Sequence, residues 1–401
     1  MLKSPFRNEA LCRHSKTGSK RLAVLAACLL VAGAAAAPAG ASSSLRLGIY
    51  DEAQTLFNGS TAGFETLGEL RARVLRLNLY WNLVAGSRPA DASDPNDPAY
   101  DWSTYDRAVR FAAARNIRIV LSIVATPDWA NGGQGPRHAP SDVTDLDRFA
   151  YAAAYRFSGS FTPPTARPLL VAAAAPLPRI DMWIAWNEPN SPTFLRPQGR
   201  KDGDRWVAAS PGIYAGICNA VWRGVHTAGD QLGVTEQVAC GATNPKGNNI
   251  FGGRRASVAP ITFLRGLKAA GARFDVYAHH PYAPSRLESP SSRPRARTTV
   301  TLGNIGDLIA ELDDLYGAGV RLWITEYGYQ TNPPDRFFGV SWARQAAYLK
   351  QAHAIARKNP RIDLLLWFLI KDESAVSRWQ SGLVDANGKK KPAFAAFRAL
   401  A

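Results

Sequence analysis

The sequence predicts one (β/α)8 barrel, and three observations support that fold class. Eight apolar runs rich in β-branched and aromatic residues alternate with amphipathic stretches along the chain. Several runs are apolar without interruption, as in residues 364–369, which is typical of parallel strands covered on both faces. The runs recur about every 41 residues, which suits a barrel with insertions. An open, doubly wound sheet is the competing architecture, but residues 50–54 lack the Gly-rich phosphate turn that would follow its first strand.

The expected elements follow one another in strict βα order. Strands are expected at residues 45–50, 74–80, 118–124, 180–186, 237–242, 274–278, 321–325 and 362–369. The helix after each strand is expected at residues 62–72, 102–115, 142–156, 210–228, 258–271, 303–317, 341–358 and 392–400, respectively. In the second of these helices, Tyr105, Ala108, Val109 and Ala112 share one apolar face. Because such alternation implies a parallel sheet, the eight units are expected to close into a barrel.

The N-terminal residues 1–41 are expected to be a secretory signal peptide. Basic residues between positions 13 and 21 precede an unbroken apolar run, 22–37, and Ala39-Gly40-Ala41 offers small residues for cleavage. The run is shorter than the roughly 20 residues that span a bilayer, which argues against an uncleaved anchor. Cys28 resembles a lipoprotein position but has too little apolar chain before it. The catalytic domain is therefore assigned to residues 42–401, and the protein to a secreted, extracellular location in which association with the cell envelope stays open.

Composition and charge narrow the function classes. With 46% hydrophobic, 20% charged and 10% aromatic residues, the chain is globular. Its net charge of +16 is compatible with nucleic acid, a membrane or an acidic substrate, and without residues 1–41 it becomes +11. We expect a monomer with no nucleic-acid partner, no cofactor, no metal and no stable membrane insertion after cleavage. Cys218 and Cys240 remain in the mature chain, where either a disulfide or two buried thiols would fit.

Two glutamates follow apolar strands at the end of the barrel where reactive groups gather. Glu188 lies in Trp-Asn-Glu-Pro-Asn after the fourth expected strand, and Glu326 lies in Ile-Thr-Glu-Tyr-Gly after the seventh. A carboxylate at the end of an apolar strand is costly to bury unless it has a partner, whereas a structural Glu belongs on a helix surface. The two glutamates are therefore the candidate catalytic pair.

These motifs resemble those of the clan A glycoside hydrolases. In that clan a strand-four Asn-Glu-Pro supplies the acid/base and a strand-seven Glu supplies the nucleophile, so the resemblance implies these roles for Glu188 and Glu326. Within the clan the sequence is most similar to the family 5 cellulase-like and family 39 xylosidase-like groups, which residues 126–130 (Thr-Pro-Asp-Trp-Ala) and 279–282 (His-His-Pro-Tyr) also resemble. The implied function is retaining hydrolysis of O-glycosidic bonds in a poly- or oligosaccharide, with the two carboxyl groups about 5–5.5 Å apart.

Further residues at strand ends are expected to bind the sugar. Asn187 is expected to bond its 2-hydroxyl, and Arg76 to point a cation at Glu326 and keep it ionised. One of His279 and His280 is expected to act at the site while the other packs, because successive strand residues face opposite ways. The other expected contacts with the sugar or nucleophile are Tyr282 and four candidate stacking platforms, Trp367, Trp81, Trp129 and Tyr329. Four acids also follow strands, where sugar hydroxyls or solvent would partner them: Asp51, Glu52, Asp372 and Glu373.

Two other functions compete with this hypothesis. The first is a secreted carbohydrate-binding barrel without turnover, against which the two intact Glu motifs argue. The second is a metal-dependent hydrolase that uses His279, His280 and Asp275, against which the lack of acidic partners on other strands argues. One feature departs from the clan: its members often carry a His near the end of strand three, and residues 122–126 contain none. This departure weakens the sugar-subsite assignments, not the carboxylate pair.

Most of the excess charge falls at the expected catalytic end of the barrel. The loops at residues 189–209, 244–257 and 283–300 contribute +8 of the +11. Solvated arginines in an Arg-rich chain explain this distribution without any function. The sharper hypothesis is that the substrate is an anionic polysaccharide or that the protein works at a negatively charged envelope surface, with an attraction that weakens as salt rises.

Overall fold

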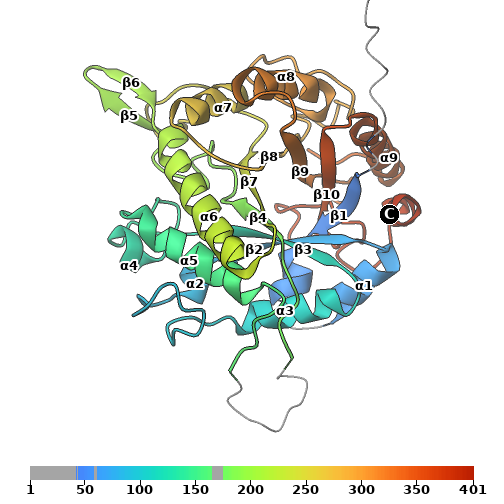
Figure 1. Cartoon of the computed structure of the whole chain (residues 1–401). Helices are drawn as coiled ribbons and strands as arrows, with labels where there is room; N and C mark the ends of the chain where they lie inside the picture. The colour runs from blue at the N-terminus through green and yellow to red at the C-terminus, as the bar shows by residue number, and fades with distance from the viewer. Residues whose placement is uncertain (1–41, 43, 58–60, 165–174) are drawn as a thin grey trace, which may run out of the picture. The chain divides into compact units, whose positions relative to one another are not determined.

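The computed structural model describes residues 42, 44–57, 61–164 and 175–401, and within them eight parallel strands close into a barrel (Figure 1). Around the barrel the order is β1 (Arg46–Tyr50), β10 (Ile362–Phe368), β9 (Arg321–Tyr327), β8 (Val276–His279), β7 (Gln237–Thr243), β4 (Met182–Ala185), β3 (Arg118–Val124) and β2 (Val74–Tyr80). The ring closes because β1 pairs with both β10 and β2. The expected single-domain (β/α)8 barrel is confirmed.

Helices surround the strands, and each long helix overlaps its expected position (Figure 1). They are α1 (Ala62–Leu70), α3 (Ser103–Ala113), α5 (Val143–Arg156), α6 (Ser210–Leu232), α7 (Pro260–Ala269), α8 (Ile305–Tyr316), α9 (Trp342–Lys358) and α10 (Pro392–Leu400). Shorter helical segments follow several strands: residues Ala53–Phe57, α2 (Trp81–Val84), α4 (Asp128–Asn131) and residues Leu302–Asn304.

Alternation along the strands divides the apolar side chains into two packed layers. Val74, Met182 and Leu364 belong to a cluster inside the barrel. Leu75 and Leu77, which alternate with inward-facing residues on β2, belong to the larger cluster between the strands and the helices. The apolar cluster fills part of the barrel interior, and polar side chains on the same inward faces form the site described below.

A disulfide joins Cys218 on α6 to Cys240 on β7, with an S–S distance of 2.05 Å. The sequence left a disulfide and two buried thiols open, and the structure has the disulfide. Both residues are fully buried. The bond therefore ties a helix of the outer layer to a strand of the barrel wall.

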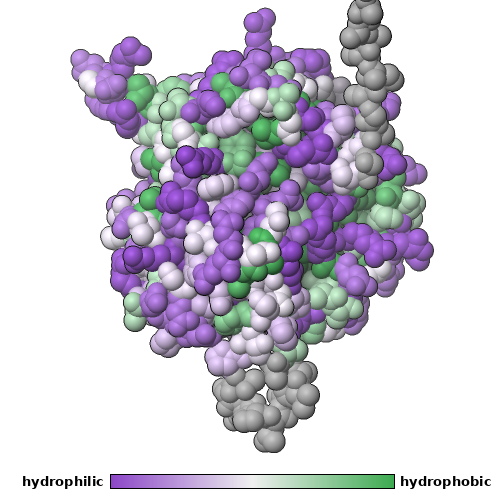
Figure 2. Space-filling view, viewed as in Figure 1, coloured by the Kyte–Doolittle hydropathy of each residue, from purple (hydrophilic) through white to green (hydrophobic). Residues whose placement is uncertain are grey.

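One element was not predicted from the apolar pattern. β5 (Gly199–Asp202) and β6 (Arg205–Ala208) form an antiparallel hairpin in the connection between β4 and α6. The hairpin extends outward from the barrel in Figure 1, and Figure 2 shows it as a mostly hydrophilic projection. Its strands are too polar to show the periodicity that revealed the barrel strands.

The expected signal peptide, residues 1–41, lies outside the described residues. Among the residues that the structure does describe, no helix combines the length and the apolar character needed to cross a membrane.

Candidate active site

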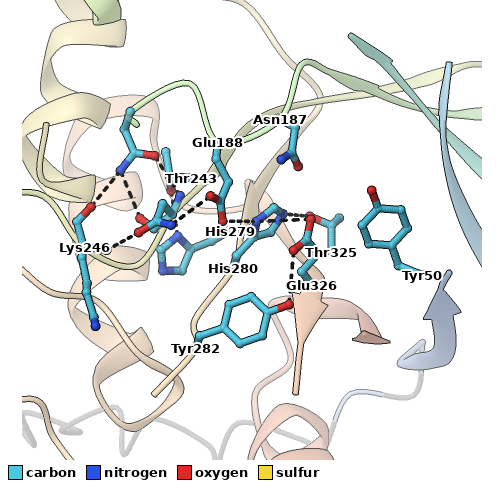
Figure 3. A network of polar contacts seen from close by, with 12 residues as sticks. Tyr50, Asn187, Glu188, Thr243, Lys246, His279, His280, Tyr282, Thr325 and Glu326 are labelled. Atoms are coloured by element: carbon cyan, nitrogen blue, oxygen red, sulfur yellow. Dashed lines mark hydrogen bonds and ion pairs between the residues drawn. The ribbon is translucent and has the colours of Figure 1, made fainter. Parts of the chain in front are cut away.

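The two candidate catalytic glutamates meet at the C-terminal end of the barrel (Figure 3). Glu188 follows β4, Glu326 is the penultimate residue of β9, and each is only 8% exposed. One oxygen of each carboxyl group and one nitrogen of His280 all lie within 4.8 Å of one another. The structure thus brings together two carboxyl groups that are 138 positions apart in the sequence.

A β-bulge turns Glu326 into the site. On β9, Trp323 packs inside the barrel while Tyr327 belongs to the outer cluster, so strict alternation between them is broken. The register with β10 shifts at this point, because Leu365 pairs with Ile324 but Trp367 pairs with Tyr327. Bulges of this kind often re-aim side chains beside active sites.

Backbone geometry also marks the other glutamate. Glu188 has a φ of 39° and Trp186 a φ of 67°, both in the left-handed region that residues with a side chain rarely adopt. The amide of Glu188 donates to the carbonyl of Ala242 on β7 at 3.0 Å, which anchors this turn to the neighbouring strand. Such conformations persist where surrounding contacts hold them, and they cluster at functional sites.

Burial sets the protonation of Glu188. Loss of solvent raises the pKa of this carboxyl to about 7, against the smaller opposing effects of the Asn244 hydrogen bond and the charge of Arg76. Asn244 donates from Nδ2 to Oε2 at 2.9 Å. A carboxyl group with this pKa keeps its proton below about pH 7 and can deliver it there.

Glu326 faces a fixed positive charge. Arg76, from the inner face of β2, is fully buried and donates from Nη1 to Glu326 Oε1 at 2.8 Å. Tyr282 donates its hydroxyl to Oε2 at 3.2 Å. The two glutamates thus occupy different environments, because Glu326 contacts a guanidinium whereas Glu188 contacts an imidazole and an amide.

Arg76 also orders the rest of the site. Its Nη2 donates to Asn187 Oδ1 at 2.6 Å, its Nε donates to Ser122 Oγ at 3.0 Å, and its guanidinium lies over the ring of Tyr50 at 4.5 Å from the centroid. Asn187 thereby has its carbonyl oxygen occupied, which leaves its Nδ2 hydrogens to point elsewhere. The expectation that Arg76 points a cation at Glu326 is met in the structure.

His280 lies between the two glutamates, and its neighbours fix its tautomer. Its Nε2 is 3.3 Å from Arg76 Nη1 and 3.0 Å from Thr325 Oγ1. Because arginine has no acceptor, Nε2 must be the accepting nitrogen, and Nδ1 then carries the hydrogen and donates to Glu188 Oε1 at 3.0 Å. Burial lowers the pKa of His280 to about 4, so the ring is neutral near pH 7.

A cavity of about 640 Å³ opens over the pair, and part of its wall was not foreseen. Trp379, from the loop after β10, is 42% exposed, and its ring centroid lies 5.7 Å from that of Tyr282. Phe368 and Tyr80 also line the cavity, and so does the expected Tyr329. The available signal for Trp379 was a lone aromatic in a polar loop after the last strand, which is weak without the fold.

Three of the expected stacking platforms do not face this cavity. Trp81 is fully buried and stacks on Phe149 with centroids 5.6 Å apart, so its expected role is wrong. Trp367 is also wrong, since it is fully buried in the layer under the helices and donates from Nε1 to the carbonyl of Ser381. Trp367 alternates with the inward-facing Leu364 and Leu366 on β10, and Trp81 begins α2 directly after β2. Trp129 packs edge-on against Trp81 under the guanidinium of Arg88 and lies outside the cavity lining.

The two histidines separate as strand alternation requires. His280 is in the site, whereas His279 is fully buried between Thr243 Oγ1, at 2.7 Å, and the carbonyl of Val300, at 3.0 Å. Burial lowers the pKa of His279 to about 3. His279 is therefore the histidine that packs, and a role for it in binding the substrate is wrong.

The four acids at strand ends divide into structural and cavity groups. Asp51 accepts from the backbone amides of Gln54 and Ile370 and so ties β1 to the end of β10. Asp372 forms a buried ion pair with Lys391 at 2.7 Å. Glu52 and Glu373 line a smaller cavity that shares Tyr50 and Phe368 with the one over the pair. Glu52 accepts from the Tyr80 hydroxyl at 2.8 Å, and burial raises the pKa of Glu52 to about 7.

The surroundings of His279, His280 and Asp275 argue against a metal-dependent hydrolase that uses these three residues. Asp275 is bonded to His226 and to the amide of Val238, away from His280. Glu188, His280 and Glu326 do form a cluster that could hold a cation. However, the Arg76 guanidinium already contacts both Glu326 and His280, and it occupies the electrostatic role that a metal ion would take there.

Comparisons with known proteins extend this picture at the level of fold. No protein-family model matches the sequence, and no curated protein matches it at a significant level. Solved structures do match. One is a family 39 glycoside hydrolase from Bacteroides cellulosilyticus WH2, with a TM-score of 0.60 and 16% identity over 88% of this chain and 63% of that one. Another is a glucosidase from Croceicoccus marinus, with a TM-score of 0.61 and 14% identity over 91% of this chain and 67% of that one. A family 5, subfamily 18 protein from Streptomyces cattleya in complex with GlcNAc also matches, with a TM-score of 0.60 and 13% identity over 90% of this chain and 80% of that one. This chain thus spans less than two thirds of the family 39 structure. These neighbours are clan A glycoside hydrolases, and the expected likeness to that clan is confirmed for the fold.

Proposed function

We propose that the chain is a retaining glycosidase that cleaves O-glycosidic bonds of a poly- or oligosaccharide by double displacement. The observation that carries this proposal is the pair of close carboxyl groups in opposite environments. Burial raises the pKa of Glu188 to about 7, while Glu326 contacts the Arg76 guanidinium at 2.8 Å. One group is suited to hold a proton and the other to attack, which is the division of labour that glycoside hydrolysis needs.

In the first step a carboxylate oxygen of Glu326 bonds to the anomeric carbon as the bond from that carbon to the leaving oxygen breaks. The proton of Glu188 passes to the leaving oxygen. In the second step Glu188, now ionised, takes a proton from water while the water oxygen attacks the anomeric carbon and releases Glu326. Asn187, held through its carbonyl oxygen by Arg76, would donate from Nδ2 to the 2-hydroxyl of the sugar.

The spacing favours a retaining over an inverting mechanism. Inverting enzymes need about 6.5–9.5 Å between the carboxyl groups to admit a water, and retaining enzymes need about 5–5.5 Å. Oxygens of Glu188 and Glu326 approach within 4.8 Å, which is closer to the retaining range than to the inverting range. Tyr282, which donates to Glu326, would help to stabilise the carboxylate when it is regenerated.

A carbohydrate substrate also agrees with the names of the structural neighbours, which include a glucosidase and a protein bound to GlcNAc. Residues 1–41 support a secreted enzyme, as expected from their basic and apolar order. The competing function is a secreted barrel that binds carbohydrate without turnover. Hydrolysis of any member of a panel of aryl glycosides and neutral or acidic polysaccharides separates the two functions.

The test of the roles uses two variants and a control. Glu326→Ala should abolish hydrolysis, and azide should restore turnover with a glycosyl azide of inverted anomeric configuration, because azide enters the space left by the nucleophile. Glu188→Ala should slow substrates with poor leaving groups by about 10²–10⁴-fold and spare aryl glycosides whose leaving group needs no proton. Glu69→Ala, at an exposed position on α1, should behave as the parent protein.

Two results would contradict the roles assigned to Glu188 and Glu326. Azide rescue of Glu326→Ala with retained configuration, or no dependence of the Glu188→Ala defect on the leaving group, would contradict the assigned roles. Sugar binding with no hydrolysis by the parent protein would favour the binding barrel instead.

A further inference from the structure

Three cavities adjoin one another at the mouth of the barrel. The catalytic cavity, of about 640 Å³, shares Ser191, Asn244 and Lys246 with a second cavity of about 440 Å³. The second shares Pro192 with a third cavity of about 670 Å³, which reaches Trp206 on the β5–β6 hairpin. We call the second and third cavities together the arm. It begins beside Glu188, because Asn244, which hydrogen-bonds Glu188, lines the first two cavities.

Apart from the catalytic glutamates, the charged side chains that line the three cavities are all positive. Lys246 and Arg286 line the catalytic cavity, Lys246 and Arg255 line the second, and Arg196 and Arg254 line the third. Among the described lining residues of all three cavities, the carboxyl groups are those of Glu188 and Glu326. A concave surface lined by cations concentrates field lines and attracts anions.

These cations lack the partners that comparable residues have elsewhere. Within the part of the chain that the structure describes, neither Arg254 nor Arg255 forms an ion pair with a carboxylate. By contrast, Arg265 on the nearby helix α7 binds Glu311 at 2.7 Å, and Arg293 binds Asp307 at 2.8 Å. Arg254 and Arg255 are both exposed, so their charges are available to a ligand.

The far end of the arm offers an aromatic surface. Trp206 is 48% exposed and lines the third cavity together with Phe251. A Cβ at Gly252 would lie 3.0 Å from the Trp206 ring, so this position keeps a glycine where the chain passes close to the indole. An exposed indole beside cations suits a ring-shaped ligand that has an apolar face and carries negative groups.

We propose that the arm binds the leaving-group side of an anionic polysaccharide, whose carboxylate groups pair with Arg254, Arg255 and Lys246. The side follows from chemistry, since the arm begins at the proton donor, which must lie next to the leaving oxygen. This inference rests on the proposed glycosidase function and names its substrate class. It gives a role to part of the excess charge in the loops after β4, β7 and β8, namely to Arg196, Lys246, Arg254, Arg255 and Arg286.

The test separates the arm from the net charge of the protein. Arg254→Gln/Arg255→Gln removes two charges from the arm, and Arg148→Gln/Arg398→Gln removes two exposed charges from α5 and α10. Both double variants are made in a Glu326→Gln background to prevent hydrolysis. Binding is measured by titration calorimetry at about 20 mM and about 500 mM salt. The acidic probes are polygalacturonate, alginate and glucuronoxylan, and the neutral probes are mannan and β-glucan.

We expect at least one acidic probe to bind more tightly than both neutral probes at low salt and to lose that advantage at high salt. The arm variant should weaken this binding by about fivefold or more, while the control variant changes it little. Equal weakening in the two variants would show general attraction by net charge and overturn the arm. Acidic probes that bind no better than neutral ones would overturn it too. Hydrolysis of aryl glycosides by the parent protein, measured separately, tests the glycosidase function itself.

Discussion

Single residues decide the chemistry of the site through burial and partners. Glu188 and Glu326 are equally buried, yet Glu326 contacts a guanidinium, while Glu188 contacts a neutral imidazole and an amide. His280 stays neutral because burial lowers its pKa to about 4, and it therefore cannot stabilise an ionised Glu188 as a cation would. The asymmetry between the glutamates thus comes from Arg76, which the sequence places on the inner face of β2.

This asymmetry predicts the alkaline limb of the pH profile. Glu188 must be protonated to act as the acid, and its pKa of about 7 means that the required form is lost as the pH rises through that value. We expect kcat/KM for a substrate with a poor leaving group to fall about tenfold per pH unit above about pH 7. The measurement is the pH dependence of initial rates.

Two variants identify the group responsible for the limb. Both variants are assayed with the same poor-leaving-group substrate as the parent protein, and in Glu188→Ala the limb should disappear from the low residual rate. Burial raises the pKa of Glu52 to about 7 as well, so Glu52→Gln is the matched control and should keep the limb. A limb that survives Glu188→Ala but vanishes in Glu52→Gln would transfer the proton-donor role to Glu52.

Sequence motifs correctly predicted the glutamates that meet at the candidate site. They did not predict which strand side chains face the site and which face the helices. Glu188, Glu326, Asn187, Arg76, His280 and Tyr282 all converge as expected. Trp367 fails because Leu364 and Leu366 face inward on β10 and leave 367 to face the helices. Without the bulge in β9, strand alternation would turn Glu326 toward the helices as well, and no local sequence pattern predicts this bulge.

At the scale of elements, the barrel strands and helices were predictable because each has its own local periodicity. The β5–β6 hairpin is polar, so its signal was the turn: Gly203-Asp204 connects the strands, and Gly203 has a φ of 59°. A Gly-Asp pair between two short runs is a hairpin signal that could have found it. The pairing of Cys218 with Cys240 depended on where α6 lies against β7, which requires the tertiary fold.

The disulfide between α6 and β7 predicts a change in stability without a change in chemistry. Its loop of 22 residues implies that Cys218→Ala/Cys240→Ala lowers the free energy of unfolding by about 2–4 kcal/mol, chiefly through the unfolded chain. Neither cysteine lines the catalytic cavity, so activity well below the melting temperature should persist. Urea unfolding followed by tryptophan fluorescence measures the difference.

A reductant provides the control for this prediction. Dithiothreitol should destabilise the parent protein to about the level of the double variant and leave the variant unchanged. Equal stability of parent and variant without reductant would show that the bond contributes nothing to the fold in solution.

At the scale of the whole molecule, the distribution of charge along the chain bears on where the protein is expected to work. Removing residues 1–41 lowers the net charge from +16 to +11, and most of what remains lies in loops at the mouth of the barrel. The described residues that build the barrel begin at β1, after the expected cleavage point. We therefore propose that the charge of residues 1–41 serves export and that the charge of the loops serves the site.

Export and the disulfide together give the last prediction. Expressed with residues 1–41 in a bacterial host, the protein should be recovered outside the cytoplasm, beginning near Ser42 and lacking the two thiol hydrogens of Cys218 and Cys240. Expressed as residues 42–401 in a reducing cytoplasm, it should have the same barrel with both hydrogens retained, because glutathione and thioredoxin keep thiols reduced there. Intact mass and N-terminal sequencing distinguish the two products. An exported protein that keeps residues 1–41 would instead indicate an uncleaved anchor, and a product beginning at Cys28 would indicate lipidation.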